Sequence, residues 1–129
     1  MGKVVGLCGI FFRSKDPAAL RRWYQEHLSM PTTDYGASFK PEDAPPGGYQ
    51  LWSPFEADSS YLGPASQTFM INLMVDDLDA CLEQVRAAGA EGVRGPDDTP
   101  YGRFGWFIDP EGRQVELWQP PADLPPDVG

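Results

Sequence analysis

The chain has 129 residues, which is the length of one ordinary domain. Hydrophobic residues make up 41% and charged residues 22%, and the 14 glycines and 14 prolines indicate many turns and short strands rather than a helical bundle. The net charge of -9 argues against a protein that binds nucleic acid or anionic membranes. No apolar run approaches the ~20 residues that span a bilayer, and no cleavable signal is recognisable, so we expect a cytoplasmic protein.

The first half of the sequence predicts a strand, a helix and further short strands. Residues 4–12 are an apolar run rich in β-formers, and Asp16 followed by Pro17 is typical of a helix start. The apolar stripe of this helix consists of Leu20, Trp23, Tyr24, His27 and Leu28, and Met30-Pro31 ends it. The remaining segments are a weakly alternating stretch at 32–40, a proline-rich acidic loop at 40–48 and a strand at 49–52.

The second half repeats this order. Residues 69–75 predict an apolar strand, Asp77 a helix cap and Gly89 the helix end. The apolar stripe of this second helix consists of Leu78, Cys81, Leu82, Val85 and Ala88. Further strands are expected at 92–94, 104–108 and 114–118, with a Gly95-Pro96 turn and a tight turn at 109–112 between them. Residues 120–129, with four prolines, predict a loosely ordered tail.

The two halves together form an internal repeat. Asp16 aligns with Asp77 at an offset of 61 residues, and a strand, a helix and returning strands surround each of them. We therefore predict an α+β protein of two βαβββ modules, at about residues 4–66 and 67–119 of a single domain that spans 1–119. Two such half-open sheets placed edge to edge enclose a cavity, where a ligand would bind.

Three parts of the sequence carry a family resemblance. They read FRSKDP and WYQEHL at 12–17 and 23–28, FMINLMVDDLDA at 69–80, and DPEGRQVELW at 109–118. Their order and spacing resemble the vicinal oxygen chelate superfamily, which includes glyoxalase I, the bleomycin- and fosfomycin-resistance proteins and the extradiol dioxygenases. The resemblance covers most of residues 4–119, and it implies a half-open mixed β-barrel with the helices outside, assembled as a homodimer.

In the metal enzymes of that superfamily, the first and last strand of each module supply the metal ligands. The matching positions of this chain are Gly9, Gln50 or Trp52 with Glu56 and Asp58 just beyond, Met70, and Glu116. Glycine offers no side chain and a thioether is a poor ligand for a hard cation, so only Glu116 is a confident ligand and we expect no metal cofactor. The alternative is a magnesium or manganese site formed by Glu116, Asn72 and water.

The histidine and cysteine counts support this expectation. A two-histidine, one-carboxylate iron site needs two imidazoles, whereas His27 is the only histidine, so extradiol dioxygenase activity is not expected. Because His27 lies on the apolar stripe of the first helix, we expect it to pack there. Cys8 and Cys81 stand in apolar contexts without CxxC spacing, and we expect buried free thiols.

Strand alternation predicts which side chains line the cavity. Asn72 and Glu116 should lie on neighbouring strands, whereas Val115 and Leu117 turn toward the helix. The candidate ligand-binding residues are Arg13, Trp52, Asn72, Trp106, Glu116 and Trp118. The tryptophans are candidates for stacking a planar ligand, although core or subunit-interface packing is the commoner explanation for them, as solvation or ion pairing is for Arg13. An internal hydrogen-bonded pair of Asn72 and Glu116 is the alternative to ligand binding by these two residues, and Tyr61 and Tyr101 are candidates to cover the mouth of the cavity.

Three functions remain open. The first is metal-independent binding of a small organic molecule in an aromatic cavity, similar to the resistance proteins of the superfamily. The second is a glyoxalase-like lyase or isomerase with an atypical site, in which Glu116 is the candidate catalytic residue and acts as a general base. The third is a non-catalytic assembly module, which a cavity filled by side chains would favour.

Overall fold

The structure is a computed structural model, and it describes residues 2–3 and 7–122. Helix α1 spans Pro17–Leu28 and helix α2 spans Leu78–Ala87. Each helix begins at a predicted capping residue, because Asp16 accepts a hydrogen bond from the Ala19 amide and Asp77 accepts one from the Ala80 amide, both at 3.1 Å. The two predicted helix starts are therefore confirmed.

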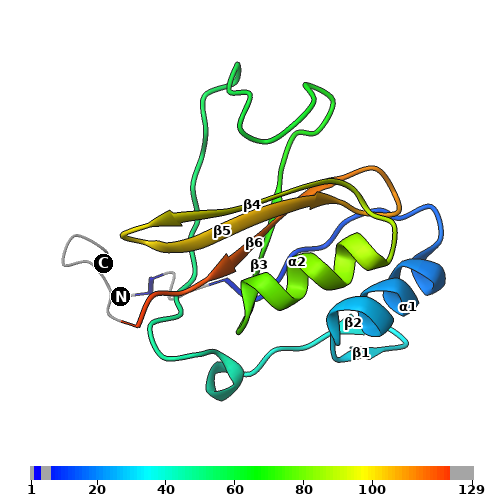
Figure 1. Cartoon of the computed structure of the whole chain (residues 1–129), viewed down its shortest axis with the longest axis horizontal. Helices are drawn as coiled ribbons and strands as arrows, with labels where there is room; N and C mark the ends of the chain where they lie inside the picture. Colours follow the sequence, from blue (N-terminus) through cyan, green and yellow to red (C-terminus); the bar gives the residue numbers. More distant parts are fainter. Residues whose placement is uncertain (1, 4–6, 123–129) are drawn as a thin grey trace.

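One sheet of four strands forms the centre of the molecule (Figure 1). Its strands are β3 (Ile71–Met74), β4 (Glu91–Thr99), β5 (Gly102–Ile108) and β6 (Gln114–Gln119), in the spatial order β3-β6-β5-β4. Strand β3 pairs with β6 in parallel, and the other pairings are antiparallel. The expected strand at 92–94 is longer than predicted, because β4 continues through Gly95-Pro96 with shifts in its pairing register.

Both helices pack on one face of this sheet and form the hydrophobic core with it. Val115 and Leu117 of β6 point to this face and are almost completely buried, as alternation predicted. Phe107 of β5 lies beside them, and the α2 side chains that contribute are Leu78, Cys81, Leu82 and Val85. Gly105 lets α2 approach the sheet closely, because a Cβ atom there would lie 2.9 Å from Cδ2 of Leu82.

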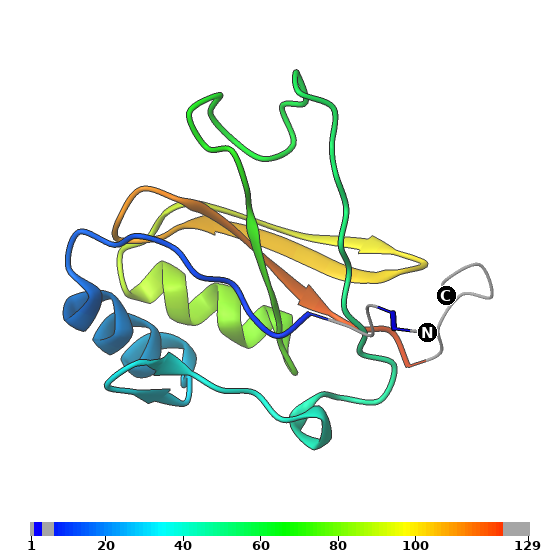
Figure 2. The same cartoon turned by 180° about the vertical axis from the view of Figure 1, so that it is seen from behind.

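The opposite face of the sheet is partly covered by chain without regular structure. After the short helix η1 (Pro41–Asp43), residues 44–70 form no helix or strand before β3 begins. Figures 1 and 2 show part of this segment rising from the sheet on the side away from the helices. Three side chains on this face, Trp106, Glu116 and Trp118, are nevertheless buried, so the segment shields them from solvent.

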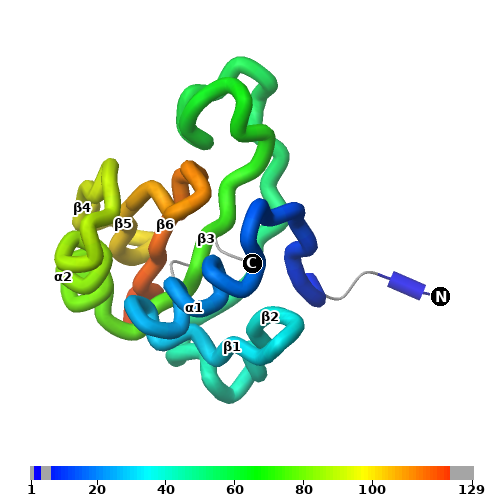
Figure 3. The backbone as a smooth tube through the Cα atoms, turned by 90° about the vertical axis from the view of Figure 1, so that its right-hand side faces the viewer, coloured from blue at the N-terminus to red at the C-terminus, as the bar shows by residue number. Residues whose placement is uncertain are grey.

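The predicted first module differs from the structure. Among the described residues, neither 7–12 nor 49–52 forms a strand, and residues 4–6 of the first expected strand lie outside the description. Figure 3 shows the N-terminal segment on the side of β3 that faces away from β4 and α2. It is tied to the later segment through a side chain, since Gln50 accepts from the Leu7 amide at 2.9 Å and donates to the Leu7 carbonyl at 3.2 Å.

Residues 7–12 and 49–52 form no strand because a strand has to pair with the backbone of a neighbouring strand. The hydrogen bonds of one glutamine side chain do not replace that pairing. The stretch expected to alternate at 32–40 instead forms a hairpin of two very short strands, β1 (Thr32–Thr33) and β2 (Gly36–Ala37). The described residues thus hold a mixed α+β fold with one four-stranded sheet and one hairpin, and they do not form a closed barrel.

Three smaller expectations are also resolved. Cys81 is a buried free thiol as predicted, whereas Cys8 is free but exposed, because the segment that carries it does not join a sheet. No helix in the described part of the chain is long and apolar enough to cross a membrane. Most of the expected tail, residues 123–129, lies outside the described residues.

Candidate functional site

Four side chains from four strands form one row across the face of the sheet opposite the helices. Asn72 of β3 lies opposite Glu116 of β6, Glu116 lies opposite Trp106 of β5, and Trp106 lies opposite Arg94 of β4. Residues opposite each other in a sheet share a face, so the row follows directly from the register. We call these four residues the cross-sheet row.

Glu116 is the centre of the row and is only 5% exposed. Its Oε1 atom accepts a hydrogen bond from Nδ2 of Asn72 at 2.6 Å. Its Oε2 atom accepts two, from the indole Nε1 of Trp106 at 2.8 Å and from the hydroxyl of Tyr61. A buried carboxylate needs such donors, because an unpaired one would lose the hydration that water gives it in the unfolded chain.

Arg94 places a positive charge at the end of the row. Its guanidinium carbon lies 4.3 Å from the centroid of the Trp106 ring, which is the geometry of a cation–π contact. The same guanidinium donates to Oε1 of Gln114 at 3.1 Å. One face of the Trp106 indole is therefore covered by Arg94, and its N–H is directed at Glu116.

Tyr61 reaches the row from the irregular segment. Its ring stacks on Phe55 with centroids 5.5 Å apart, and it meets the ring of Trp106 edge to face at 6.4 Å. Burial and the hydrogen bond to Glu116 raise the pKa of the Tyr61 phenol, which keeps this group protonated and able to donate at neutral pH. Tyr61 was expected at the mouth of a cavity between two sheets, and its bond to Glu116 was not anticipated.

Gln114 anchors that segment to the sheet. Its backbone exchanges two hydrogen bonds of 2.8 Å with the side chain of Gln67, in the manner of a strand pair. Its side-chain nitrogen donates to the carbonyl of Tyr61 at 3.1 Å and to the sulfur of Met70 at 3.5 Å. Strand alternation puts Gln114 on the same face as Glu116, but nothing in the sequence indicates which loop it binds.

The structure brings together three of the six predicted ligand-binding residues, namely Asn72, Trp106 and Glu116. Trp118 lies on the same face of β6, two residues further along, where its indole donates to the carbonyl of Tyr101 at 2.8 Å and its ring meets that of Tyr49 at 4.7 Å. Arg13 is exposed and lies beside the β5–β6 turn, where its carbonyl accepts from Arg113 at 2.6 Å.

Trp52 is 80% exposed, on a segment that is not a strand. The alternation used to turn it toward a cavity therefore does not apply to it. The cavity expected between two sheets is likewise not formed by the described residues, because the first of those sheets is missing.

The donor set around Glu116 does not fit a divalent cation. Both oxygens of the carboxylate face N–H or O–H groups, whose hydrogens would repel a metal ion. Asn72 presents its amide nitrogen rather than its oxygen to Glu116. Within the described ranges, no three His, Cys, Asp or Glu side chains gather in a way that could hold a metal. His27 lies on α1. The centroid of its ring is 5.2 Å from that of Trp23, and its Nε2 atom is 3.9 Å from Oε2 of Glu26.

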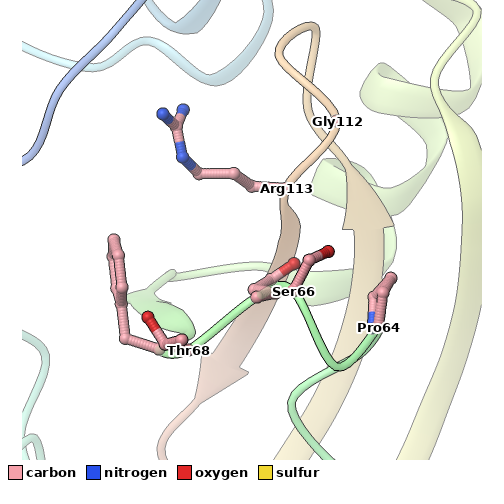
Figure 4. Close-up of a pocket in the computed structure, with 7 residues that line it drawn as sticks. Pro64, Ser66, Thr68, Gly112 and Arg113 are labelled. Atoms are coloured by element: carbon pink, nitrogen blue, oxygen red, sulfur yellow. The ribbon is translucent and has the colours of Figure 1, made fainter.

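A pocket of about 230 Å³ opens next to the anchored segment (Figure 4). It lies between residues 64–69 and the turn that precedes β6. Figure 4 shows Arg113 on one side of this pocket, with Ser66 and Thr68 on the chain that crosses it. The lining residues are Pro64, Ser66, Gln67, Thr68, Phe69, Gly112 and Arg113. This pocket adjoins the cross-sheet row through the pairing of Gln67 with Gln114.

The site as a whole combines one buried hydrogen-bond acceptor with aromatic surfaces. It has the composition of sites that orient a small molecule by a few polar groups and hold it by apolar contact. Its acceptor, Glu116, is already supplied with donors by the protein. A ligand that uses this carboxylate therefore has to replace one of them.

Comparison with known proteins places the chain in a family. A family profile described as a glyoxalase-like domain matches residues 9–118. None of the curated proteins matches the chain. Among solved structures, TnmS3, an antibiotic-binding protein from Streptomyces sp. CB03234, is similar with a TM-score of 0.56 and 21% identity, over 94% of this chain and 100% of that one.

Two further structures are similar to parts or most of the chain. The integron cassette protein VPC_CASS1 from V. Pseudocholerae has a TM-score of 0.52 and 19% identity, over 92% of this chain and 97% of that one. A glyoxalase/bleomycin resistance protein from Streptomyces sp. CB03234 is 39% identical over 38% of this chain and 42% of that one, with a TM-score of 0.35. The family profile covers most of the sequence, and the chain therefore belongs to the glyoxalase-like domain family of the vicinal oxygen chelate superfamily.

Proposed function

We propose that this protein binds a small organic molecule without a metal ion, at the cross-sheet row. The observation that carries the proposal is the environment of Glu116, a buried carboxylate that accepts hydrogen bonds from Asn72, Trp106 and Tyr61 among aromatic rings. One polar group in an aromatic setting orients a ligand, and the rings supply contact area. The antibiotic-binding description of TnmS3 supports the same class of function for this chain.

Metal independence rests on the donors around Glu116. A cation on either oxygen would have to displace the donors on that oxygen and would gain no second carboxylate or imidazole from the described residues near it. The matched positions Gly9 and Met70 are unsuited to the task for the reasons given above, and Met70 accepts a weak hydrogen bond from Gln114 instead.

The experiment uses the purified full chain after dialysis against a chelator. A panel of small aromatic, cationic and neutral compounds is added while the four tryptophan indole N–H resonances are followed by NMR. We expect at least one compound to shift the Trp106 resonance with the same affinity in the presence and absence of chelator. Stoichiometric zinc, nickel, manganese or iron that survives purification and is lost in Glu116→Gln would contradict the proposal.

A second candidate is a glyoxalase-like lyase or isomerase centred on Glu116. The observation that favours it is the hydrogen bond between Tyr61 and Glu116, which pairs a phenol that stays protonated with a carboxylate that accepts a proton. Such a pair would exchange the acidic proton of a bound carbon acid. Deuterium incorporation that is lost in both Glu116→Gln and Tyr61→Phe would establish this function over simple binding.

We further propose that the protein is a cytoplasmic homodimer. Large apolar side chains of the two segments expected to be strands are exposed, including Phe11 at 93% and Leu51 at 66%. Exposed apolar groups of this size favour burial in an interface. A second copy would also supply the strand partners that these segments lack, and so complete the half-open barrel. Light scattering after size-exclusion chromatography tests the dimer directly, and a mass of 14.2 kDa would contradict it.

A further inference from the structure

We infer that the Tyr61 side chain stands in the place of the ligand, and that the ligand is a hydroxylated aromatic molecule that displaces it. In the bound state the ligand hydroxyl donates to Oε2 of Glu116, and its ring lies between Phe55 and Trp106. This inference deepens the proposed function and rests on it, because it names the chemical class of the small molecule.

The first argument is the position of the Tyr61 ring. It is a phenol whose hydroxyl reaches the central carboxylate, whose face stacks on Phe55 at an interplanar angle of 19°, and whose edge contact with Trp106 is at 83°. These contacts depend only on the hydroxyaryl group, and they do not require that this group be attached to the protein chain. An external phenol in this position would make the same three contacts.

The second argument is that the ring can leave. Tyr61 is 42% exposed and stands in a segment without helix or strand, so its outer side already faces solvent. The segment is anchored independently of the ring, through the Tyr61 carbonyl and the side chain of Gln67, both of which bind Gln114. Rotation of the side chain therefore breaks one hydrogen bond and two ring contacts, while the backbone stays bound to the sheet.

The third argument concerns which ligands can occupy the position of the Tyr61 ring. When Tyr61 leaves, Oε2 of Glu116 keeps only the indole of Trp106 as a donor, although both of these side chains are only 5% exposed in the structure. A ligand that supplies a hydroxyl restores the lost hydrogen bond. An ether of the same shape instead sets an oxygen lone pair against the carboxylate, and buried polar groups left unpaired are costly. An anionic ligand is repelled by Glu116 itself.

The fourth argument limits the direction of approach. Arg94 covers one face of Trp106, so a ligand ring cannot stack there without displacing a cation–π contact. Asn72 fills the side of Glu116 that carries Oε1. The position of the Tyr61 ring is what remains next to Oε2.

The test uses the full chain and two matched probes, 2-naphthol and 2-methoxynaphthalene, with titration by calorimetry and the Trp106 indole resonance as the site-specific readout. We expect 2-naphthol to bind wild-type protein at least about tenfold more tightly than the ether, because the ether cannot donate to Glu116. Equal affinities for the two probes, or no binding of 2-naphthol at millimolar concentration, would overturn the inference.

Two variants test the displacement. Tyr61→Ala removes the resident ring. The variant should then bind 2-naphthol at least about tenfold more tightly than wild type does, because the ligand no longer has to displace the Tyr61 side chain. Tyr61→Phe keeps the ring and removes its hydroxyl, so it should also bind 2-naphthol more tightly, and it serves if the alanine variant does not fold. Tyr35→Ala is the matched control, since this tyrosine is 97% exposed, and it should behave as wild type.

The remaining outcomes separate this inference from the proposed function. If only Tyr61→Ala binds, and it binds 4-methylphenol but not 2-naphthol, the site is simply the hole left by the removed side chain and the inference is wrong. If 2-naphthol fails but another compound of the panel shifts Trp106 in the presence of chelator, the inference is wrong and the proposed function stands. If no compound does so, both are wrong.

Discussion

Asn72 and Glu116 lie directly opposite each other in the parallel pairing of β3 with β6, and the amide of Asn72 donates to the carboxylate at 2.6 Å. This pair joins the edge strand of the sheet to its neighbour on the face that carries the candidate site. It therefore has a structural role in addition to any role in binding, and the first prediction separates the two.

Replacing Asn72 by alanine should destabilise the protein by about 1–3 kcal/mol, because Oε1 of Glu116 is then buried without its donor. Urea denaturation followed by circular dichroism measures the loss, with Tyr35→Ala as the control. The binding free energy of 2-naphthol should change much less than the free energy of unfolding, since the ligand hydroxyl is expected at Oε2 of Glu116. A variant as stable as wild type would show that Oε1 has found another donor.

Replacing Gly105 by alanine should destabilise the protein by about 1–3 kcal/mol, for a reason of packing alone. The new Cβ atom would lie 2.9 Å from Leu82 Cδ2 and 3.2 Å from Leu78 Cδ1, so α2 would have to move away from the sheet. Gly9→Ala is the matched control, because its Cβ atom meets only Phe11 at 3.8 Å. Thermal unfolding of both variants checks this, and equal midpoints would contradict the close approach of α2.

The hydrogen bonds of Glu111 predict how the stability of the protein depends on pH in the acidic range. It accepts hydrogen bonds from the Ser14 hydroxyl at 2.6 Å and from the Lys15 and Asp16 amides at 3.1 Å, and these partners lower its pKa from 4.5 to about 2. A carboxyl group whose pKa is lowered by folding stabilises the protein fully above its unfolded pKa, and this stabilisation is lost as the pH falls from 4.5 toward 2.

Urea titrations between pH 2 and 6 should therefore show the free energy of unfolding falling below pH 4.5. In Glu111→Gln the stability at pH 7 should be lower and the acid slope shallower, because the titrating group is gone. An unchanged slope in this variant would mean that other carboxyl groups control the acid response.

The two cysteines should differ sharply in reactivity. Cys8 is exposed, whereas burial, together with Asp76 and Asp77, raises the pKa of the Cys81 thiol to about 11. A thiol reagent at pH 8 should label one cysteine in the native protein and two in denaturant, and mass spectrometry of peptides should assign the native label to Cys8. Slow labelling of Cys8 would indicate that its segment is covered in solution, as in a dimer.

The sequence predicted those features that depend on local pattern. The capping aspartates Asp16 and Asp77 act within three residues of themselves, and alternation along β6 separates Glu116 from Val115 and Leu117 without knowledge of the rest of the fold. The pairing of Asn72 with Glu116 could be expected because both strands were placed by the family resemblance.

What the sequence missed depends on contacts between distant segments. The strand expected at 4–12 has the right composition, but composition does not provide the neighbouring backbone that a strand needs, and its described part, 7–12, forms none. Arg94 was not recognised as part of the site, because its place over Trp106 follows from irregular pairing of β4 with β5. The bond from Tyr61 to Glu116 spans 55 residues of chain and begins in an irregular segment, and no periodic pattern reports such a contact.

The hydrogen bonds of Glu111 join the start of α1 to the turn between β5 and β6 across about 95 residues, and Tyr24 donates to Asp109 across 85. On a ribosome, α1 therefore emerges long before the groups that fix its position exist. Helix α1 and the long irregular segment after it reach their final positions only after β5 and β6 have left the exit tunnel. Until then, aromatic side chains of both segments are exposed to solvent. Folding of this protein is thus completed from its C-terminal half, and premature termination before residue 109 leaves α1 with its contacts to α2 but without its hydrogen bonds to Asp109 and Glu111.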